Sequence, residues 1–299
     1  MTGRAAALAA FVVAACSSAR APRLSACESA PTAARAATVP SLLADPVFAV
    51  TPWDSGDRSG SCLSAAPWGD TGWGVEAASF FDAAGREGGD RTIDGARLAV
   101  SGGAAQFSAS DASGRWAFAR FIQGDVWGGT SCGPVSWNRF APIPVANQEL
   151  RLDFDVCLQG GTLDSIVGGW ILVGVNVWVS APTMPERGRD RHGRKPLVLD
   201  LMVHHRTSMI GTRDGSHDND LAYHYQVAVA EAPPGRWTHV SIDLARELRA
   251  AVEHFGLQGA WDDLTIEQVE LVAEVHHASA AARVDDVSLL RRQVSASRQ

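Results

Sequence analysis

Two carboxylates in strand-like segments are the side chains of this sequence with the clearest capacity for chemistry. Asp200 lies in the middle of residues 196–206 (PLVLDLMVHHR), and Glu274 lies in residues 269–277 (VELVAEVHH). Strand interiors are depleted in Asp, and burial of a carboxylate is costly unless it is paired or takes part in a reaction. Two carboxylates in one groove can divide acid–base work, because one keeps its proton while the other stays ionised.

Side-chain alternation gives each carboxylate a defined set of neighbours. The relevant face of the first segment comprises Val198, Asp200, Met202 and His204, and that of the second comprises Glu270, Val272, Glu274 and His276. We expect the two faces to meet in one groove. Glu274 is the candidate proton donor, since the apolar strand around it should desolvate it, and Asp200 is the ionised partner. Met202, His204 and His276 are expected to contact the substrate.

A third segment, residues 169–180 (GWILVGVNVWVS), is apolar except for Asn176, which shares a face with Trp178. A lone amide in such a strand needs a hydrogen-bond partner, and a carboxylate on the neighbouring strand would supply one. Trp178 could then form the floor of a sugar subsite. The alternative is that Asn176 bonds another side chain or water while Trp178 fills the core, and the sequence leaves both open.

Metal binding is the less favoured use of these residues. His204, His205, His276 and His277 lie near the two acids, but adjacent histidines do not have a known zinc-ligand spacing. The loop at residues 211–220 carries Asp214, Asp218 and Asp220, which do not follow the EF-hand pattern. We therefore expect no metal and no other cofactor.

Composition indicates a globular protein, because 46% of the 299 residues are hydrophobic and 20% are charged. The net charge is −7, with no basic run long enough to follow a phosphate backbone, so a nucleic-acid partner is not expected. Ten Trp against two Tyr supply flat surfaces for stacking on sugars, although Trp also fills cores. We expect a monomer.

The N-terminus resembles a bacterial lipoprotein signal. Arg4 precedes an apolar run too short to span a bilayer, and the run ends in residues 13–16 (VAAC). The resemblance implies that Cys16 is lipidated, which would attach the protein to the cell envelope or outer membrane. An ordinary secretory signal with cleavage nearby is the alternative, and either one exports the protein. We expect a signal peptide (1–15), a tether (16–45), the folded domain (46–292) and a short tail (293–299).

Export makes the other cysteines candidates for disulfides. If Cys16 carries lipid, an even number remains, and two bridges with three possible connectivities can form among Cys27, Cys62, Cys132 and Cys157. Cys27 lies in the expected tether and could instead be unpaired.

From Phe48 onward, short alternating segments follow one another between turn-forming clusters, which predicts an all-β jelly-roll sandwich of two antiparallel sheets in a single domain. Residues 150–157 alternate most clearly, with Leu150, Leu152, Phe154 and Val156 facing inward. One amphipathic helix is predicted at about residues 243–255, capped by Asp243 and ended by Gly256. We expect it to pack on the outer face of a sheet.

The order of these parts resembles glycoside hydrolase family twelve, the β-jelly-roll endoglucanases and xyloglucanases. The family has a strand ending in a YD-aromatic pattern, a strand reading E-I-M-I-W, a further strand and helix, and a strand with the acid/base Glu. The segments NVWVS, DLMVHH, DLARELRAAVEHFGL and VAEVHH stand at the corresponding places, at residues 176–180, 200–205, 243–257 and 272–277. The resemblance implies that Asp200 is the nucleophile, Glu274 the acid/base and Asn176 the residue that orients the nucleophile.

The sequence departs from the family at the centre of the site. Asp200 stands where the family has Glu, Asn176 where it has Asp, and His204 where it has Trp. We therefore expect either a diverged, lipid-anchored hydrolase of β-linked glucans or a non-catalytic carbohydrate-binding jelly roll. Residues 281–290 (AARVDDVSLL) resemble the last strand of many carbohydrate-binding modules. A purely structural surface lipoprotein is the third reading. The sugar, the linkage and the stereochemical outcome remain open.

Overall fold

The computed structural model describes residues 27, 41–43, 53–54, 63–65, 73–81, 87–92, 96–124, 141–163, 169–186, 193–207, 216–218 and 222–293. Cys16, Cys62 and Cys132 lie outside the described residues, as do the expected signal peptide, most of the tether and the C-terminal tail. Among the described residues, no helix is long and apolar enough to cross a membrane.

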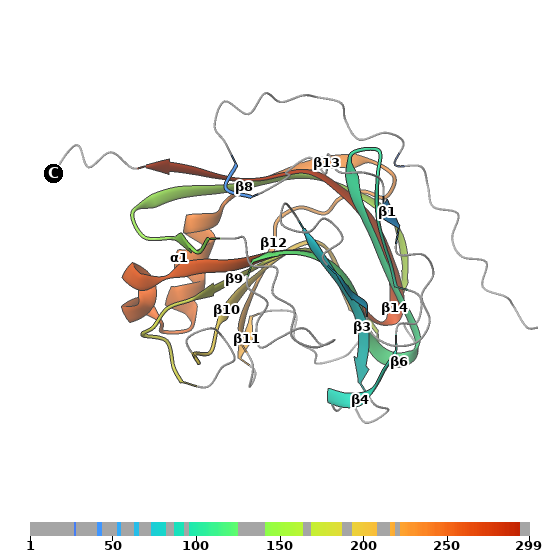
Figure 1. Ribbon diagram of the computed structural model, residues 1–299, viewed down its shortest axis with the longest axis horizontal. Coiled ribbons are helices and arrows are strands. Elements are labelled where there is room, and N and C mark those ends of the chain that lie inside the picture. The colour runs from blue at the N-terminus through green and yellow to red at the C-terminus, as the bar shows by residue number, and fades with distance from the viewer. Residues whose placement is uncertain are drawn as a thin grey trace, which may run out of the picture.

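Strands make up most of the described chain (Figure 1). Their bounds are β1 Trp53–Asp54, β2 Leu63–Ala65, β3 Gly74–Phe81, β4 Glu87–Thr92, β5 Arg97–Ser101, β6 Ala104–Gly124, β7 Ile143–Pro144, β8 Gln148–Leu163, β9 Trp170–Ser180, β10 Leu197–Thr207, β11 His217–Asp218, β12 Tyr223–Ala228, β13 Trp237–Asp243 and β14 Thr265–Gln293. The helices are α1 Leu244–His254 and the 3-10 helix η2 Gln258–Asp263.

The strands form two layers that share β6 and β14 (Figure 1). The first half of β14 pairs with β9 and with the second half of β6, whereas its second half pairs with β8 and with the first half of β6. The inner layer therefore has the order β3-β6-β14-β9-β10-β12-β11, and the outer layer has the order β1-β5-β6-β14-β8-β13. The all-β jelly-roll prediction is confirmed.

Two details of that prediction are wrong. The layers are continuous rather than separate, because β14 passes from one to the other at a bulge between His276 and Ala278. His277 at this bulge has a positive φ of 46°, and bulges of this kind bend a strand. The sheets are also not wholly antiparallel, since β10 and β12 run parallel.

The main core lies between the layers. The residues of β8 that were predicted to face inward are all 1% exposed or less, and they pack with apolar residues of β9, β10 and β14 in one cluster. The alternate positions, which include Asp155 and Cys157, point to the other side of the outer layer. Burial at about 25 cal/mol per Å² of apolar surface makes this core the main source of stability.

Helix α1 begins and ends where the sequence predicts. The backbone N–H of Arg246 donates to the Asp243 carboxylate at 3.0 Å, and Gly256 follows the helix with a φ of 69°. The predicted position on the outer face of a sheet is wrong. The helix contacts β8 of the outer layer and β10 of the inner layer, and it buries Leu244, Leu248, Ala251 and Val252 in the shared core.

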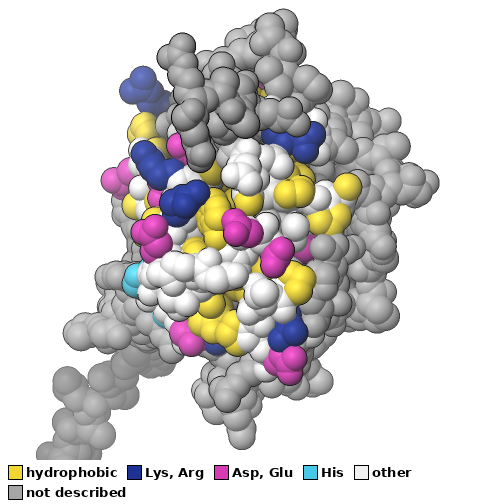
Figure 2. Space-filling model, turned by 90° about the vertical axis from the view of Figure 1, so that its left-hand side faces the viewer, with side chains coloured by type: hydrophobic (Ala, Val, Ile, Leu, Met, Phe, Trp, Pro, Cys, Tyr) yellow, Lys and Arg dark blue, Asp and Glu magenta, His cyan; other side chains and the backbone are white. Residues whose placement is uncertain are grey.

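The face of the molecule that includes α1 carries charged side chains of both signs, interspersed with apolar ones (Figure 2). The exposed residues of α1 include the cations Arg246 and Arg249 and the anion Glu253. Mixed charge of this kind is typical of a solvated surface.

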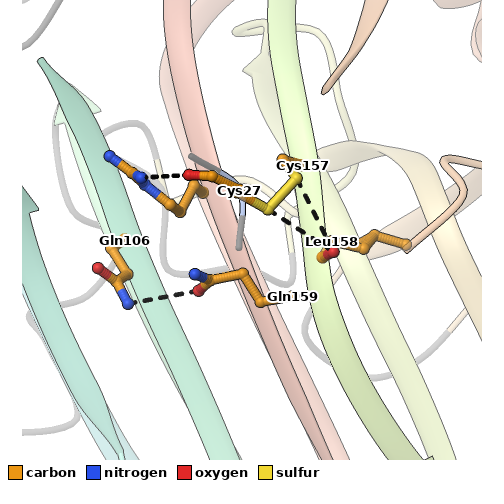
Figure 3. Close-up of a disulfide and its surroundings, with 6 residues drawn as sticks. Cys27, Gln106, Cys157, Leu158 and Gln159 are labelled. Carbon is orange, nitrogen blue, oxygen red and sulfur yellow. Dashed lines mark hydrogen bonds between the residues drawn. A yellow bond between two sulfur atoms is a disulfide. The ribbon is translucent and has the colours of Figure 1, made fainter. Parts of the chain in front are cut away.

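A disulfide joins Cys27 to Cys157 of β8, with the Cα atoms 6.1 Å apart (Figure 3). Arg283 of β14 donates to the carbonyl oxygen of Cys27 at 2.7 Å. Further along the chain, the backbone N–H of Leu42 donates to Leu289 of β14. The described parts of the N-terminal segment are thus attached to the outer layer, and the expectation that Cys27 could be unpaired does not hold.

Candidate active site

The inner layer has one face against the core and a second face turned away from the outer layer. Val175, Val177, Leu199, Leu201 and Leu271 point into the core, so the alternate residues of the same strands point to the second face. We call the second face the carboxylate face, and define it by Arg120, Asn176, Asp200, His224, Gln226, Gln268, Glu270 and Glu274.

One row of polar residues crosses four neighbouring strands. Glu270 of β14 pairs with Asn176 of β9, Asn176 pairs with Asp200 of β10, and Asp200 pairs with Gln226 of β12. Since adjacent strands lie about 4.8 Å apart, the Cα atoms of Asp200 and Glu270 are roughly 10 Å apart. Asn176 and Asp200 are 4% and 3% exposed, and Glu270 is fully buried. Strands bearing a carboxylate therefore lie on both sides of Asn176, but its side-chain Oδ1 atom has no hydrogen-bond partner among the described residues, so the predicted hydrogen bond to a carboxylate stays a prediction.

Asp200 is held by His224 of β12. The distance from His224 Nδ1 to Asp200 Oδ2 is 3.1 Å. Burial lowers the pKa of His224, but the charge of Asp200 and its hydrogen bond outweigh that effect, helped by the charges of Glu274 and Glu270, so the pKa is raised overall. His224 therefore stays protonated up to a higher pH than an isolated histidine would.

Glu270 is held by Arg120 of β6. The distance from Arg120 Nη1 to Glu270 Oε1 is 2.7 Å, and Gln268 also donates to Glu270 Oε1. Arginine keeps its charge at any physiological pH, so Glu270 has a permanent cationic partner. A second negative charge is thereby fixed on the face that carries Asp200.

Glu274 is the carboxyl group that keeps its proton. Its side chain is half-buried, and none of the described Arg, Lys or His side chains forms an ion pair with it. Loss of solvation raises its pKa to about 8; the charges of Asp200 and Glu270 raise it too, while Arg120 and His224 lower it. At neutral pH, Glu274 therefore retains its proton and can act as a proton donor.

Apolar side chains surround these groups. Leu172, Met202 and Val272 form a small cluster on the carboxylate face, with Trp170 packed against it. Trp178 is partly exposed, and its ring meets the ring of His224 edge-on at 6.4 Å. Leu172, Met202 and Val272 are themselves 7% exposed or less.

Most of the residues proposed from the sequence lie together on this face. Asp200, Asn176, Trp178, Met202 and Glu274 do, and His276 follows two residues after Glu274, opposite Trp170. His204 does not. A bulge between Met202 and His204 shifts the register, so His204 lies opposite Val173, a core-facing residue.

The sequence reasoning missed three charged residues of the site. Glu270 was placed on the correct face but given no role, and Arg120 and His224 were not singled out. Alternation would have placed His224 with Gln226 and Arg120 with Phe118 on single faces. It could not show which strands are neighbours, so the two ion pairs were not predictable.

No group of three His, Cys, Asp or Glu side chains within the described ranges is arranged to hold a metal ion. Asp218, one of the three loop carboxylates considered for calcium, is paired with Lys195. Asp214 and Asp220 lie outside the described residues.

Taken together, the residues of the carboxylate face can transfer protons. Glu274 can donate a proton to an ether or glycosidic oxygen, and Asp200 can act as a base or nucleophile. The buried Oδ1 atom of Asn176 accepts no hydrogen bond from the described residues, and it lies in register between the two ionised carboxylates.

No protein-family model and no curated protein matches this chain. Solved structures match it in part. A family 11 xylanase from Neocallimastix patriciarum has a TM-score of 0.46 at 12% identity, over 81% of this chain and 100% of the other. An endoglucanase from Rhodothermus marinus has a TM-score of 0.46 at 14% identity, over 82% and 100%. A family 12 xyloglucanase from Bacillus licheniformis has a TM-score of 0.42 at 8% identity, over 81% and 100%.

Proposed function

We propose that this protein is an exported, lipid-anchored glycoside hydrolase that cleaves β-linked glucan chains with Glu274 and Asp200. The observation that carries the proposal is the contrast between the two carboxyl groups. Glu274 has a pKa raised to about 8, whereas Asp200 is paired with His224 on the same face. Glycosidic cleavage needs one protonated and one ionised carboxyl group on either side of the scissile bond.

In the proposed reaction, Glu274 gives its proton to the glycosidic oxygen as the bond from that oxygen to the anomeric carbon breaks. Asp200 either bonds to the anomeric carbon or takes a proton from the attacking water. Asn176, which pairs with Asp200 in register, would orient it. Trp178 and Met202 would contact the sugar ring, and His276 would lie next to the leaving group.

The test is release of reducing sugar from a panel of soluble polysaccharides that includes β-1,4-glucan, xyloglucan, xylan and mixed-linkage glucan. Proton NMR of the first product formed gives the anomeric configuration and decides between retention and inversion. Release by the wild type and none by Glu274→Gln supports the proposal. Equal release by both proteins would remove Glu274 from the mechanism.

A glycan-binding protein without activity is the second candidate, because Asp200 is only 3% exposed. A nucleophile has to reach the anomeric carbon, whereas a binding residue can act through its neighbours. Calorimetric titration with cello- and xylo-oligosaccharides separates the two candidates. Binding without release from any substrate favours the second.

Export is supported by the disulfide, since disulfides persist in oxidising compartments, and the lipid anchor rests on the resemblance of residues 13–16 to a lipoprotein signal. Mass spectrometry of the N-terminal peptide tests the anchor. A diacylglycerol-modified Cys16 is expected, and Cys16→Ser should move the protein from the membrane fraction to the soluble one. An unmodified N-terminus beginning elsewhere would point to an ordinary secretory signal.

A further inference from the structure

His224 is the titratable cation of the carboxylate face, and the proposed reaction gives it no role. Its position depends on the parallel pairing of β10 and β12, which aligns His224 with Val198 and Gln226 with Asp200. The ring of His224 therefore lies diagonally across from Asp200, and Nδ1 reaches Oδ2 at 3.1 Å. The side chains of His224 and Asp200 are 21% and 4% exposed, so the pair is largely shielded from water.

Neighbouring rings fix the orientation of the imidazole. The ring of His217 on β11 stacks on it, with centroids 4.8 Å apart and planes within 8°. The edge of Trp178 approaches from β9 at an interplanar angle of 76°. A ring packed from two sides keeps Nδ1 directed at Asp200 rather than turning to water.

The charged groups around His224 are mostly acidic. From the described residues, these are Asp200 on β10, Glu270 and Glu274 on β14, the distant Arg120 on β6, and His217 on β11. Asp218, next to His217, is paired with Lys195. The charge and hydrogen bond of Asp200, and more weakly the carboxyl groups of Glu274 and Glu270, favour the protonated form of His224, which agrees with the direction of its pKa.

Asp200 and Glu270 thus have different kinds of partner. Arg120 stays charged at all accessible pH, whereas His224 can lose its proton. We propose that His224, as an imidazolium, is a positioning residue that holds the Asp200 carboxylate ionised and aimed at the substrate, so that the site works only while both His224 and Glu274 carry protons. The inference rests on the proposed function, because it assumes that Asp200 reacts.

The first test does not need activity. The full chain is labelled with ¹⁵N at histidine, and the ring nitrogen shifts of His224 are followed from pH 5 to pH 10 in the wild type and in Asp200→Asn. We expect the pKa of His224 to lie above 6.5 in the wild type and to be lower in Asp200→Asn, because the charge and hydrogen bond of Asp200 raise it. An unchanged titration in Asp200→Asn would overturn the proposal.

The second test uses the pH dependence of kcat/KM on any glycan that the wild type cleaves. Two protons must stay bound, so the alkaline limb of log(kcat/KM) should approach a slope of about −2. In His224→Gln, the slope should become about −1, with kcat reduced on the order of 10- to 100-fold and KM little changed. His224→Arg supplies a cation that stays charged at any accessible pH, so it should recover part of kcat while keeping the slope of −1.

His254→Gln is the matched control. His254 is an exposed histidine of α1 whose ring contacts Tyr225 and Phe255, and this variant should keep the wild-type slope. An alkaline slope of −2 in His224→Gln would overturn the proposal. If no glycan is cleaved but the pKa of His224 is lower in Asp200→Asn than in the wild type, the proposed function fails and the ionic role of His224 stands. If a glycan is cleaved but the pKa of His224 is the same in both proteins, the proposed function stands and the role of His224 fails.

Discussion

Asp200 and Glu270 lie opposite the same residue, Asn176, in the hydrogen-bonded register of three adjacent strands. Each carboxylate has its own cation, His224 for Asp200 and Arg120 for Glu270. These two ion pairs fix two negative charges on the carboxylate face, and Glu274 is the third carboxyl group there. Its raised pKa is a consequence of this arrangement as well as of burial.

Replacement of Glu274 by Gln should reduce kcat according to how much the leaving group needs a proton. We expect a loss of roughly 10²- to 10⁴-fold on a polysaccharide. The loss should be much smaller on an aryl glycoside with an acidic phenol as leaving group, because that oxygen leaves without protonation. Steady-state rates on both substrates check this, with the exposed helix variant Glu253→Gln as control. Equal losses on both substrates would contradict a proton-donor role.

Glu274 should also make the stability of the fold depend on pH. Its ordinary pKa is 4.5 and its folded pKa is about 8, so between these values the unfolded chain ionises while the folded chain does not. The free energy of unfolding therefore falls by at most about 5 kcal/mol as the pH rises through this window. Above the window it levels off. Urea unfolding at pH 5 and pH 8 should show a smaller difference for Glu274→Gln than for the wild type. Identical differences would show that Glu274 titrates normally.

Removal of the Asp200 carboxylate tests its chemical role. Asp200→Ala should lower kcat/KM by roughly 10²- to 10⁴-fold. Added azide is small and anionic, and it should restore part of the rate by taking the place of the carboxylate. The configuration of the glycosyl azide product, read by NMR, then shows on which side of the sugar Asp200 acts. Full activity of Asp200→Asn, which keeps the size of the side chain, would exclude Asp200 from the reaction.

The Arg120–Glu270 pair should matter for stability more than for catalysis. Arg120→Met leaves the fully buried Glu270 without its guanidinium, which should cost about 3–5 kcal/mol. The double variant Arg120→Met/Glu270→Gln should recover much of this loss, because no uncompensated charge remains. Urea titration of the three proteins measures both effects. Arg246→Met breaks the exposed pair with Glu247 on α1 and should leave the midpoint unchanged.

The Cys27–Cys157 disulfide closes a long loop, because the two cysteines are 130 positions apart in sequence. Its removal in Cys27→Ser/Cys157→Ser should lower stability by about 2–5 kcal/mol. Thermal unfolding with and without a reducing agent measures this loss. A reducing agent should lower the Tm of the wild type towards that of the double variant. A double variant as stable as the oxidised wild type would mean that the bridge adds nothing to the fold.

Periodicity was sufficient to predict the class of fold and much of the site. The alternation of residues 150–157 predicted which side chains of β8 face the core, and the capping pattern placed α1 within a residue or two of its bounds. The carboxylate face followed from the same argument, because Asp200, Asn176 and Glu274 each lie at the polar positions of an apolar strand.

What the sequence could not provide was the register between strands. The bulge after Met202 places His204 on the opposite face of β10 from Asp200 and Met202, and no residue pattern predicts such an insertion. The parallel pairing of β12 with β10 brings His224 to Asp200 from 24 positions away in the chain. The placement of α1 between the layers depends on the passage of β14 from one layer to the other, which is a long-range feature.

The bridge from Cys27 to β8 fixes where the leading part of the chain departs from the domain. Cys157 points away from the core on the outer layer, whereas the three carboxyl groups lie on the far side of the inner layer. If the chain ahead of Cys27 were attached to a surface, the attachment would therefore lie on the side of the outer layer. The carboxylate face would then be turned away from that surface.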